Sequence, residues 1–554
     1  MSGVQVEIVA GALEAATREM VASLIRTAFS PNIKERADCS TALCDIEGRA
    51  LSLMTNAPAH LGSTLRLVPE LLKRFPLASL REGDAFLAND PYIVGVTHLN
   101  DCTVVVPVFA QAEPVGFAVA VAHHSDVGGR VPGSEAGDNT SIFQDGLRVP
   151  PVRIRAAGQL CGDMIELFLL NSRTPHFGEG DLMAQLASCE RGVQRLGELF
   201  RRHGIAQTRE YLDRIIDATE ARLRARIREV LTEGVYEAED WLDDNGVDGQ
   251  PVRFVVRLTV RDGTIEFDCS DCPDQVESGK NVPLSHTLAT AYFCLSAAVD
   301  PYAATNEGLY RTVRLIARPG SILNPLPPAA VGSRNTTSMV LADAMFNALG
   351  QAGPARAIAA CGPGQGIILS GHDAQRSRYF VDYENFAGGQ GARGHSDGLD
   401  VVQVNMSNTS NLPVESLEME FPLRIERYEM IADSGGAGRF RGGLGAVRDV
   451  RVLCDKATVA LRSARQRFAA GGLAGGRPGA LGAFILNPDS TAERRLPSTG
   501  SSIPLARGDV LRVVTPGGGG FGDPRERDRE RVRRDREQGK VSVESAAQVY
   551  RLDE

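Results

Sequence analysis

Apolar residues recur with a helical period in several long stretches of the chain. Over residues 6–29, Leu13, Met20 and Leu24 fall near one stripe of a helix, and Pro31 marks its end. The same spacing predicts further helices over 179–203, 207–233, 284–298 and 338–350. Amphipathic helices are therefore expected in both the first half and the middle of the chain.

Two other apolar runs, 104–109 and 115–122, lack this period because nearly every position in them is apolar. Such runs are typical of strands buried on both faces. The short interval between them predicts that the two strands form a hairpin. Shorter strands are predicted at 253–260 and 264–268, and from about residue 365 the pattern changes to strands and turns with many glycines.

Composition narrows the function classes. The 554 residues are 43% hydrophobic and 23% charged, with a net charge of −9, which argues against a nucleic-acid-binding protein. No apolar run approaches the roughly 18 residues that cross a bilayer, and the N-terminal residues lack the pattern of a signal peptide. The ten cysteines are interpreted as reduced thiols, so we expect a cytoplasmic protein without a membrane or nucleic-acid partner.

The densest group of chemically capable residues lies between 89 and 126. His98 and Asp101 are three residues apart, and the predicted hairpin can bring His123 beside His98, with Asp38 as a further anionic ligand. Two imidazoles with one or two carboxylates suit a divalent ion such as Zn, Mn or Fe. The alternative is a pair of polar strand ends with hydrogen-bonded histidines. In the metal interpretation, the neighbouring His124 and Asp126 act as outer-shell groups or proton carriers.

Other sequence features are weaker evidence for a functional site. Cys269 and Cys272 form a single CxxC without the second pair that a zinc ribbon needs. His60 is expected either to pack or to contact a substrate. The glycine-rich stretches are expected to form tight turns and close backbone approaches, with anion-binding nests as the alternative. There is no Walker A sequence and no strand–GxGxxG–helix unit, so no nucleotide-binding residues are predicted in this chain.

These observations predict an α+β fold of several domains. The expected architecture is a metal-binding α/β N-terminal half followed by a β-rich, Gly-rich C-terminal half. An acidic segment around Trp241 suggests the first boundary. The four expected parts are an N-terminal metal-binding catalytic region (1–235), a central α/β region (236–400), a β-rich C-terminal region (401–523) and a charged helical tail (524–554).

Several ordered blocks resemble the B subunits of the hydantoinase/oxoprolinase family. The blocks are Asn89-Asp-Pro-Tyr, Thr97-His-Leu-Asn-Asp, His123-His-Ser-Asp-Val-Gly-Gly, Asn171-Ser-Arg-Thr-Pro and the closing Thr515-Pro-Gly-Gly-Gly-Gly-Phe-Gly-Asp-Pro. The resemblance covers roughly residues 5–550, nearly the whole chain. One departure is Gln144-Asp-Gly, where the family pattern is expected to read Gln-Glu-Gly.

The resemblance implies a metal, Zn or Mn, held by Asp38, His98, Asp101 and His123. It also implies an A-type partner subunit that binds ATP, in a hetero-oligomer such as (αβ)2. The implied activity is that of an ATP-dependent cyclic amidase of the hydantoinase, 5-oxoprolinase or lactamase type. The partner would phosphorylate the carbonyl oxygen of a small ring amide, and metal-bound water on this chain would hydrolyse it. His124 and Asp126 would then move protons.

Two alternatives stay open at this point. The same family contains ATP-dependent ketone carboxylases of the acetone and acetophenone type, which use bicarbonate, and the two groups share most of the sequence blocks. The chain could also be a non-catalytic scaffold for its partner. The blocks do not choose among these functions, the substrate or the metal.

Overall fold

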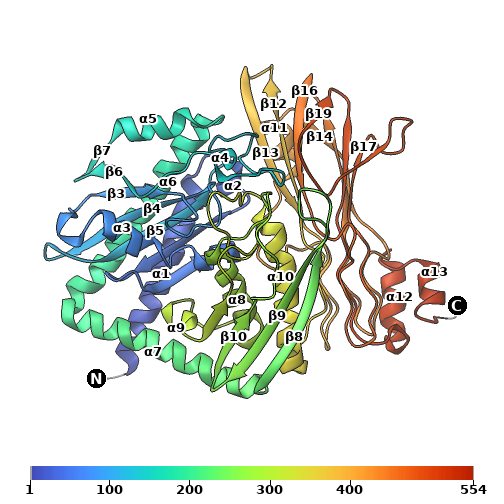
Figure 1. The fold of residues 1–554 in the computed structure, drawn as a ribbon, viewed down its shortest axis with the longest axis horizontal. Coiled ribbons are helices and arrows are strands. Elements are labelled where there is room, and N and C mark those ends of the chain that lie inside the picture. Colours follow the sequence, from blue (N-terminus) through green and yellow to red (C-terminus); the bar gives the residue numbers. More distant parts are fainter. Residues whose placement is uncertain (1–2, 553–554) are drawn as a thin grey trace.

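A seven-stranded antiparallel sheet forms the centre of the N-terminal half in the computed structural model, which describes residues 3–552 (Figure 1). Its strand order is β2-β1-β5-β4-β3-β6-β7. The strands are β1 (Cys39–Cys44), β2 (Ala50–Thr55), β3 (Ala85–Ala88), β4 (Asp101–Ala110), β5 (Glu113–His123), β6 (Val152–Ala156) and β7 (Gln159–Leu160). The predicted hairpin is β4–β5, and it lies in the middle of the sheet.

Both faces of this sheet are covered, which explains why its central strands are apolar at nearly every position. Val104 and Val106 pack in a core with helices α1 (Gly3–Thr27) and α6 (Pro175–His203). Val105, on the opposite face, packs in a second core with helices α8 (Leu284–Val299) and α10 (Arg334–Ala352). The β4–β5 hairpin is therefore sandwiched between two layers of helices.

A second sheet of four strands, in the order β11-β10-β9-β8, packs against the same α8 and α10 core (Figure 1). Its strands are β8 (Gly234–Leu242), β9 (Val252–Arg261), β10 (Thr264–Asp268) and β11 (Val313–Ile316). It follows α7 (Ile205–Val230), which packs along α1 and α9 (Glu307–Tyr310). These helices and strands confirm the elements predicted from periodicity in this part of the chain.

The C-terminal half contains two further sheets, ordered β13-β12-β16-β19 and β14-β15-β20-β17-β18, which share one hydrophobic core. The strands are β12 (Gln365–Asp373), β13 (Arg378–Phe386), β14 (Leu423–Met430), β15 (Ala446–Val452), β16 (Lys456–Arg462), β17 (Ala483–Leu486), β18 (Arg494–Leu496), β19 (Thr499–Ala506) and β20 (Val510–Val514). The α+β fold with a β-rich second half is thus confirmed. The division into four regions stays a prediction, although β12 precedes residue 400 and pairs with the later β16 as well as with β13.

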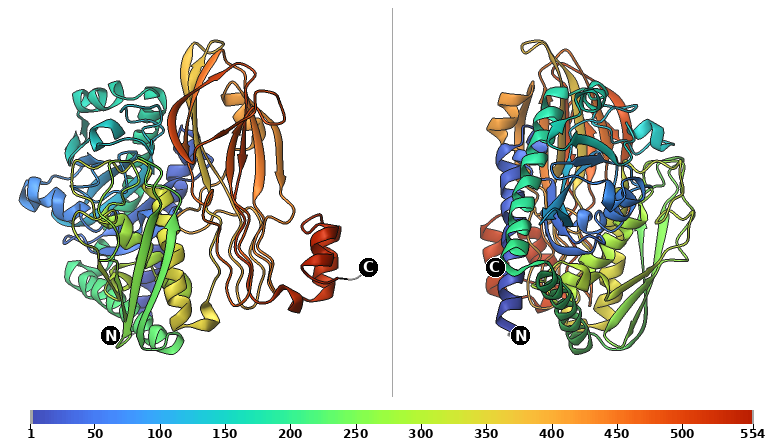
Figure 2. Two further views of the ribbon diagram at one scale, coloured as in Figure 1. Left: turned by 45° about the vertical axis from the view of Figure 1, so that its right-hand side comes forward. Right: turned by 90° about the vertical axis from the view of Figure 1, so that its left-hand side faces the viewer.

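Extended glycine-rich segments run side by side from these sheets toward the C-terminal helices (Figure 2). We call segments 388–391, 435–443, 471–479 and 517–520 the glycine bundle. Its backbones hydrogen-bond one another, as in Gly436 N to Gly518 O (2.8 Å) and Gly518 N to Gly443 O (3.0 Å). A Cβ on Gly389 would lie 1.9 Å from the carbonyl oxygen of Gly443, closer than any side chain permits. These glycines therefore serve close backbone approach, which the glycine content suggested together with tight turns.

The remaining helices are short. They are α2 (Pro31–Lys34), α3 (Leu67–Arg74), α4 (Ile142–Asp145), α5 (Gly162–Leu170), α11 (Val414–Glu420), α12 (Arg529–Glu537), α13 (Val543–Gln548) and the 3₁₀ turns η1 (Pro58–Gly62), η2 (Leu77–Ser79), η3 (Pro354–Arg356) and η4 (Pro524–Glu526). Within residues 3–552, no helix has both the length and the apolar character needed to cross a membrane.

Candidate metal centre

Three predicted ligand residues, Asp38, Asp101 and His123, lie at adjoining ends of strands β1, β4 and β5 in the seven-stranded sheet. The pairing of β4 with β5 places Asp101 directly opposite His123. On the other side of β5, Cys39 of β1 pairs with Ala122, and the amide of His123 donates to the carbonyl oxygen of the preceding residue, Asp38 (3.1 Å). The backbone register of β1, β5 and β4 therefore brings Asp38, His123 and Asp101 to adjacent strand ends.

Two loop residues complete the site. His98 precedes β4, and its ring centroid lies 4.9 Å from that of His123. Glu135 comes from the loop after β5, and its Oε1 lies 3.1 Å from Nδ1 of His98 and 3.5 Å from Nε2 of His123. One ligand atom from each of these three buried residues lies within 4.8 Å of the other two. We call His98, His123 and Glu135 the polar cluster.

Asp101 joins the polar cluster to His60. Its Oδ1 lies 3.2 Å from Nε2 of His98 and 3.4 Å from Nε2 of His60, and its Oδ2 accepts a hydrogen bond from Thr97. Nδ1 of His60 is hydrogen-bonded to the hydroxyl of Ser40 (2.9 Å). The side chain of Asp38 is only partly buried and has no hydrogen bond or ion pair within the described residues. It nevertheless contributes to the electrostatic field at His60.

The polar cluster contains buried atoms that the protein itself leaves unsatisfied. Both ring nitrogens of His98 and Oδ1 of Asp101 lie close to each other or to Glu135, but no hydrogen bond of acceptable geometry connects them. Burial, with the Arg334 cation as a second cause, lowers the pKa of His98 to about 4. The imidazole is therefore neutral at physiological pH, and its lone pair is free for a cation.

Two arginines from distant parts of the chain hold Glu135. Arg334, the first residue of α10, approaches Oε1 at 2.8 Å, and Arg462, the last residue of β16, approaches Oε2 at 2.9 Å. Burial alone would raise the pKa of Glu135, but the charges of Arg462 and Arg334 outweigh it and hold the pKa below its ordinary value. The ring of Tyr383 in β13 lies 4.8 Å from that of His123. The C-terminal sheets thus form one wall of the centre.

A second layer of residues positions His123. Asn32 in α2 lies 3.1 Å from Nδ1 of His123, and its Oδ1 accepts a hydrogen bond from Arg36 (2.6 Å). Arg36 in turn donates to Asp382 and Glu384 of β13. Such outer contacts orient histidine ligands in metal sites.

The residues present fit a divalent cation. Imidazole nitrogens and carboxylate oxygens are the donors that Zn and Mn prefer, and a cation would satisfy the unpaired atoms of His98 and Asp101. The identity of the metal does not follow from this donor set.

The side chains of the two predicted proton carriers, His124 and Asp126, contact residues outside the polar cluster. Nε2 of His124 is hydrogen-bonded to Gln185 (2.9 Å), and its ring packs edge-on against Phe168. The carboxylate of Asp126 accepts from Arg173 and from the backbone amide of Gly133. Among the described residues, neither side chain has a hydrogen bond or ion pair with the polar cluster. Proton transfer by His124 and Asp126 stays a prediction.

Sequence reasoning missed Glu135, Arg334 and Arg462. Glu135 lies in a loop with no motif or metal-ligand spacing, and the two arginines are 199 and 327 residues further along the chain. A pattern search has no local signal for such a group. The sequence left open whether His60 packs or contacts a substrate. In the structure its side chain lies beside Asp101.

Known proteins match the chain over nearly its full length. The beta subunit of caprolactamase from Pseudomonas jessenii is 33% identical and covers 98% of this chain and 94% of its own. The 5-oxoprolinase of Dictyostelium discoideum is 31% identical over 90% of this chain and 38% of its own. The crystal structure of ATP-dependent caprolactamase from P. jessenii superposes with a TM-score of 0.92, at 31% identity, over 99% of this chain and 96% of its own.

The structure of an acetone carboxylase matches in fold alone, with a TM-score of 0.90 at 20% identity over 99% of this chain and 79% of its own. The name of the caprolactamase chain as a beta subunit implies a partner subunit in that enzyme. The family model described as hydantoinase B/oxoprolinase matches residues 2–524. Sequence blocks, fold and family match agree, and the chain belongs to the hydantoinase B/oxoprolinase family.

Proposed function

We propose that this chain is the metal-dependent B subunit of an ATP-dependent cyclic amidase of the hydantoinase, 5-oxoprolinase or lactamase type. The observation that carries the proposal is the polar cluster, because buried histidine and carboxylate atoms without hydrogen bonds need a ligand. The caprolactamase and 5-oxoprolinase relatives support the reaction class. A structural group of strand ends would be expected to satisfy these atoms internally.

In this proposal, Asp38, His98, Asp101 and His123 hold a divalent cation, and Glu135 is a further candidate ligand. When bound, the cation supplies a Lewis acid that lowers the pKa of a water molecule and offsets developing negative charge. Arg334 and Arg462 fix the carboxylate of Glu135, while Asn32 fixes the ring of His123. The protein thus holds the donor atoms in place before a substrate arrives.

The requirement for ATP follows from the chemistry of the amide. Resonance with nitrogen makes a ring carbonyl a poor electrophile. An A-type partner subunit would phosphorylate the carbonyl oxygen and so create a good leaving group. Burial of the polar cluster between the N-terminal sheet and the C-terminal sheets would shield the activated ring from bulk water.

The test uses the chain co-expressed with its ATP-binding partner. ATP consumption is followed over hydantoins, lactams, 5-oxoproline and simple ketones, with and without bicarbonate. We expect ring opening of a cyclic amide without bicarbonate. Turnover only with a ketone and bicarbonate would replace the proposal with a carboxylase function.

Substitution of the ligands tests the site within the same complex. His98→Ala and His123→Ala are expected to remove the metal, measured by elemental analysis, and to abolish turnover. His395→Ala, at an exposed loop histidine, is the control and should keep both. Full metal content and turnover in either ligand variant would refute the site, and full turnover in both would support a scaffold. Thermal unfolding checks that each variant is folded.

A further inference from the structure

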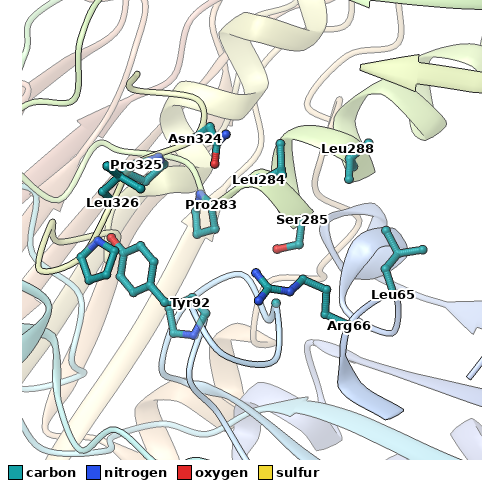
Figure 3. Close-up of a pocket in the computed structure, with 13 residues that line it drawn as sticks. Leu65, Arg66, Tyr92, Pro283, Leu284, Ser285, Leu288, Asn324, Pro325 and Leu326 are labelled. Carbon is teal, nitrogen blue, oxygen red and sulfur yellow. The ribbon is translucent and has the colours of Figure 1, made fainter. Parts of the chain in front are cut away.

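A cavity of about 230 Å³ lies beside the metal centre, between the η1–α3 connection, the 91–95 loop, the start of α8 and the 324–327 loop (Figure 3). Leu65, Leu284 and Leu288 contribute apolar walls, and Arg66 and Ser285 contribute polar groups. A cavity of roughly 150 Å³ is enough to hold benzene. The space is therefore sufficient for a small organic molecule.

The N-terminus of α8 opens into this cavity. The helix is 16 residues long, its N-cap residue is Pro283, and no side chain caps it. The first amide groups of a helix carry partial positive charge and bind anions when no cap satisfies them. This end of the cavity is thus electropositive.

Two side chains reinforce that character. Ser285 is 6% exposed, and its hydroxyl has no hydrogen-bond partner among residues 3–552. The guanidinium of Arg66 has one ion-pair partner within the described residues, Glu70, at 3.6 Å. Figure 3 shows the Ser285 hydroxyl and the Arg66 guanidinium directed toward the same space beside Tyr92.

Gly95 keeps that space open. A Cβ at this position would lie 3.5 Å from the Cβ atoms of both Arg66 and Ser285. The backbone of Gly95 also has a φ of +81°, a conformation that favours glycine. The two polar side chains therefore flank a gap that contains no side chain of its own.

We infer that this cavity binds a small organic phosphate. A phosphate presents three terminal oxygens, which matches three donor groups that converge from separate elements: the start of α8, the hydroxyl of Ser285 and the guanidinium of Arg66. The leucine walls take the organic part. A carboxylate carries one negative charge, whereas a phosphate monoester carries close to two, so the guanidinium of Arg66 and the start of α8 favour the phosphate.

The position of the cavity connects it to the reaction, and this link rests on the proposed function. His286 follows Ser285 in α8 and is fully buried, and in the described part of the chain neither of its ring nitrogens has a hydrogen-bond partner. Its electrostatic neighbours include Arg334, Asp101 and His98. Ser285, which lines the cavity, and His286, which lies in the electrostatic field of His98 and Asp101, are therefore consecutive residues of α8. The cavity would hold the phosphorylated ring that the partner subunit supplies.

Binding is tested on the full-length chain alone, after chelator treatment so that no metal can bind phosphate. Isothermal titration calorimetry compares n-butyl phosphate, inorganic phosphate and butyrate. We expect butyl phosphate to bind at least ~10-fold more tightly than either of the others, because it alone uses both the apolar walls and all three donors. Tighter binding of butyrate, or no saturable binding of butyl phosphate, would overturn the inference.

Substitutions of the residues that line the cavity test where butyl phosphate binds. Arg66→Met is expected to weaken butyl phosphate binding by about 10–100-fold and Ser285→Ala by about 5–10-fold, in line with charged and neutral hydrogen bonds. Arg74→Met, at an exposed position of α3, and Ser296→Ala, in the last turn of α8, are matched controls that should bind as the unaltered chain does. Equal affinity in all four variants would place the phosphate elsewhere and refute the assignment.

The result of the phosphate-binding experiment can be interpreted separately from the turnover of the complex. If the chain binds the phosphate but its complex opens no ring amide, the proposed function is refuted and the assignment of the phosphate pocket still stands. Ring opening by the complex, without phosphate binding in this cavity, would refute the pocket alone.

Discussion

The polar cluster and the glycine bundle bring distant segments together by opposite means. In the polar cluster, charged and polar side chains from both halves of the chain meet around Glu135, which is held by Arg334 and Arg462. In the glycine bundle, backbones meet because side chains are missing, as at Gly389 and Gly443. One site has unsatisfied polar atoms, whereas the other uses backbone amides to bind neighbouring segments.

This difference separates a site that can take a ligand from a region that serves the fold. Anion-binding nests need free amide groups. The amides of Gly436, Gly443, Gly518 and Gly520 instead donate to carbonyls of adjacent segments. The chemistry of the protein is therefore assigned to the polar cluster, and the glycine bundle is assigned a structural role. Three predictions test this contrast, from the largest expected effect to the smallest.

Glu135→Gln is expected to lower the free energy of unfolding by about 3–5 kcal/mol, because it removes the carboxylate that compensates the buried Arg462 and the nearer of the two beside Arg334. Urea unfolding of the metal-free chain measures the change. Glu239→Gln, which breaks an exposed pair with Arg253, is the control and should have little effect. Equal stability of the two variants would mean that the charges at the polar cluster are not coupled.

Gly389→Ala is expected to cost about 3 kcal/mol, since its methyl group would overlap the carbonyl oxygen of Gly443 and force the segments apart. Thermal unfolding and its enthalpy report the change. The matched control is Gly471→Ala in the same bundle, where an added Cβ meets no atom within 4 Å. If both substitutions are tolerated, close approach is not the reason for the glycines.

Asn32→Ala is expected to weaken metal binding by about 10-fold, roughly 1.4 kcal/mol, because His123 loses a group that orients its ring. Competition with a fluorescent chelator measures the affinity. Asn171→Ala is the control, because this exposed side chain bonds only to the carbonyl of Leu167. An unchanged affinity in Asn32→Ala would show that the ring of His123 is held without this contact.

Much of the N-terminal half could be predicted from local patterns. The β4–β5 hairpin is formed by strands that adjoin in sequence, so apolar runs and a short turn are enough to predict it. The same hairpin places Asp101 opposite His123, and the three-residue spacing adds His98. Asp38 was predicted as a further anionic ligand, and its place beside His123 depends on the pairing of β1 with β5.

The glycine bundle could not be predicted in the same way. The glycine clusters were visible in the sequence, but glycine is equally suited to tight turns and to close packing of extended segments. The hydrogen-bond partners of segment 517–520 lie up to 159 residues away, because the amide of Gly519 donates to the carbonyl oxygen of Ala360. Only the packing of all four segments shows which property of glycine is used.

The sequence by itself determined the family, the α+β fold class, the long helices and the pair of histidines with a neighbouring aspartate. Tertiary structure alone decided that Glu135 joins His98 and His123 with Arg334 and Arg462 on its carboxylate, and that His124 and Asp126 face Gln185 and Arg173. The physical reason is range. Periodicity and hairpins depend on neighbours along the chain, whereas compensation of a buried charge depends on whichever side chain the fold brings near.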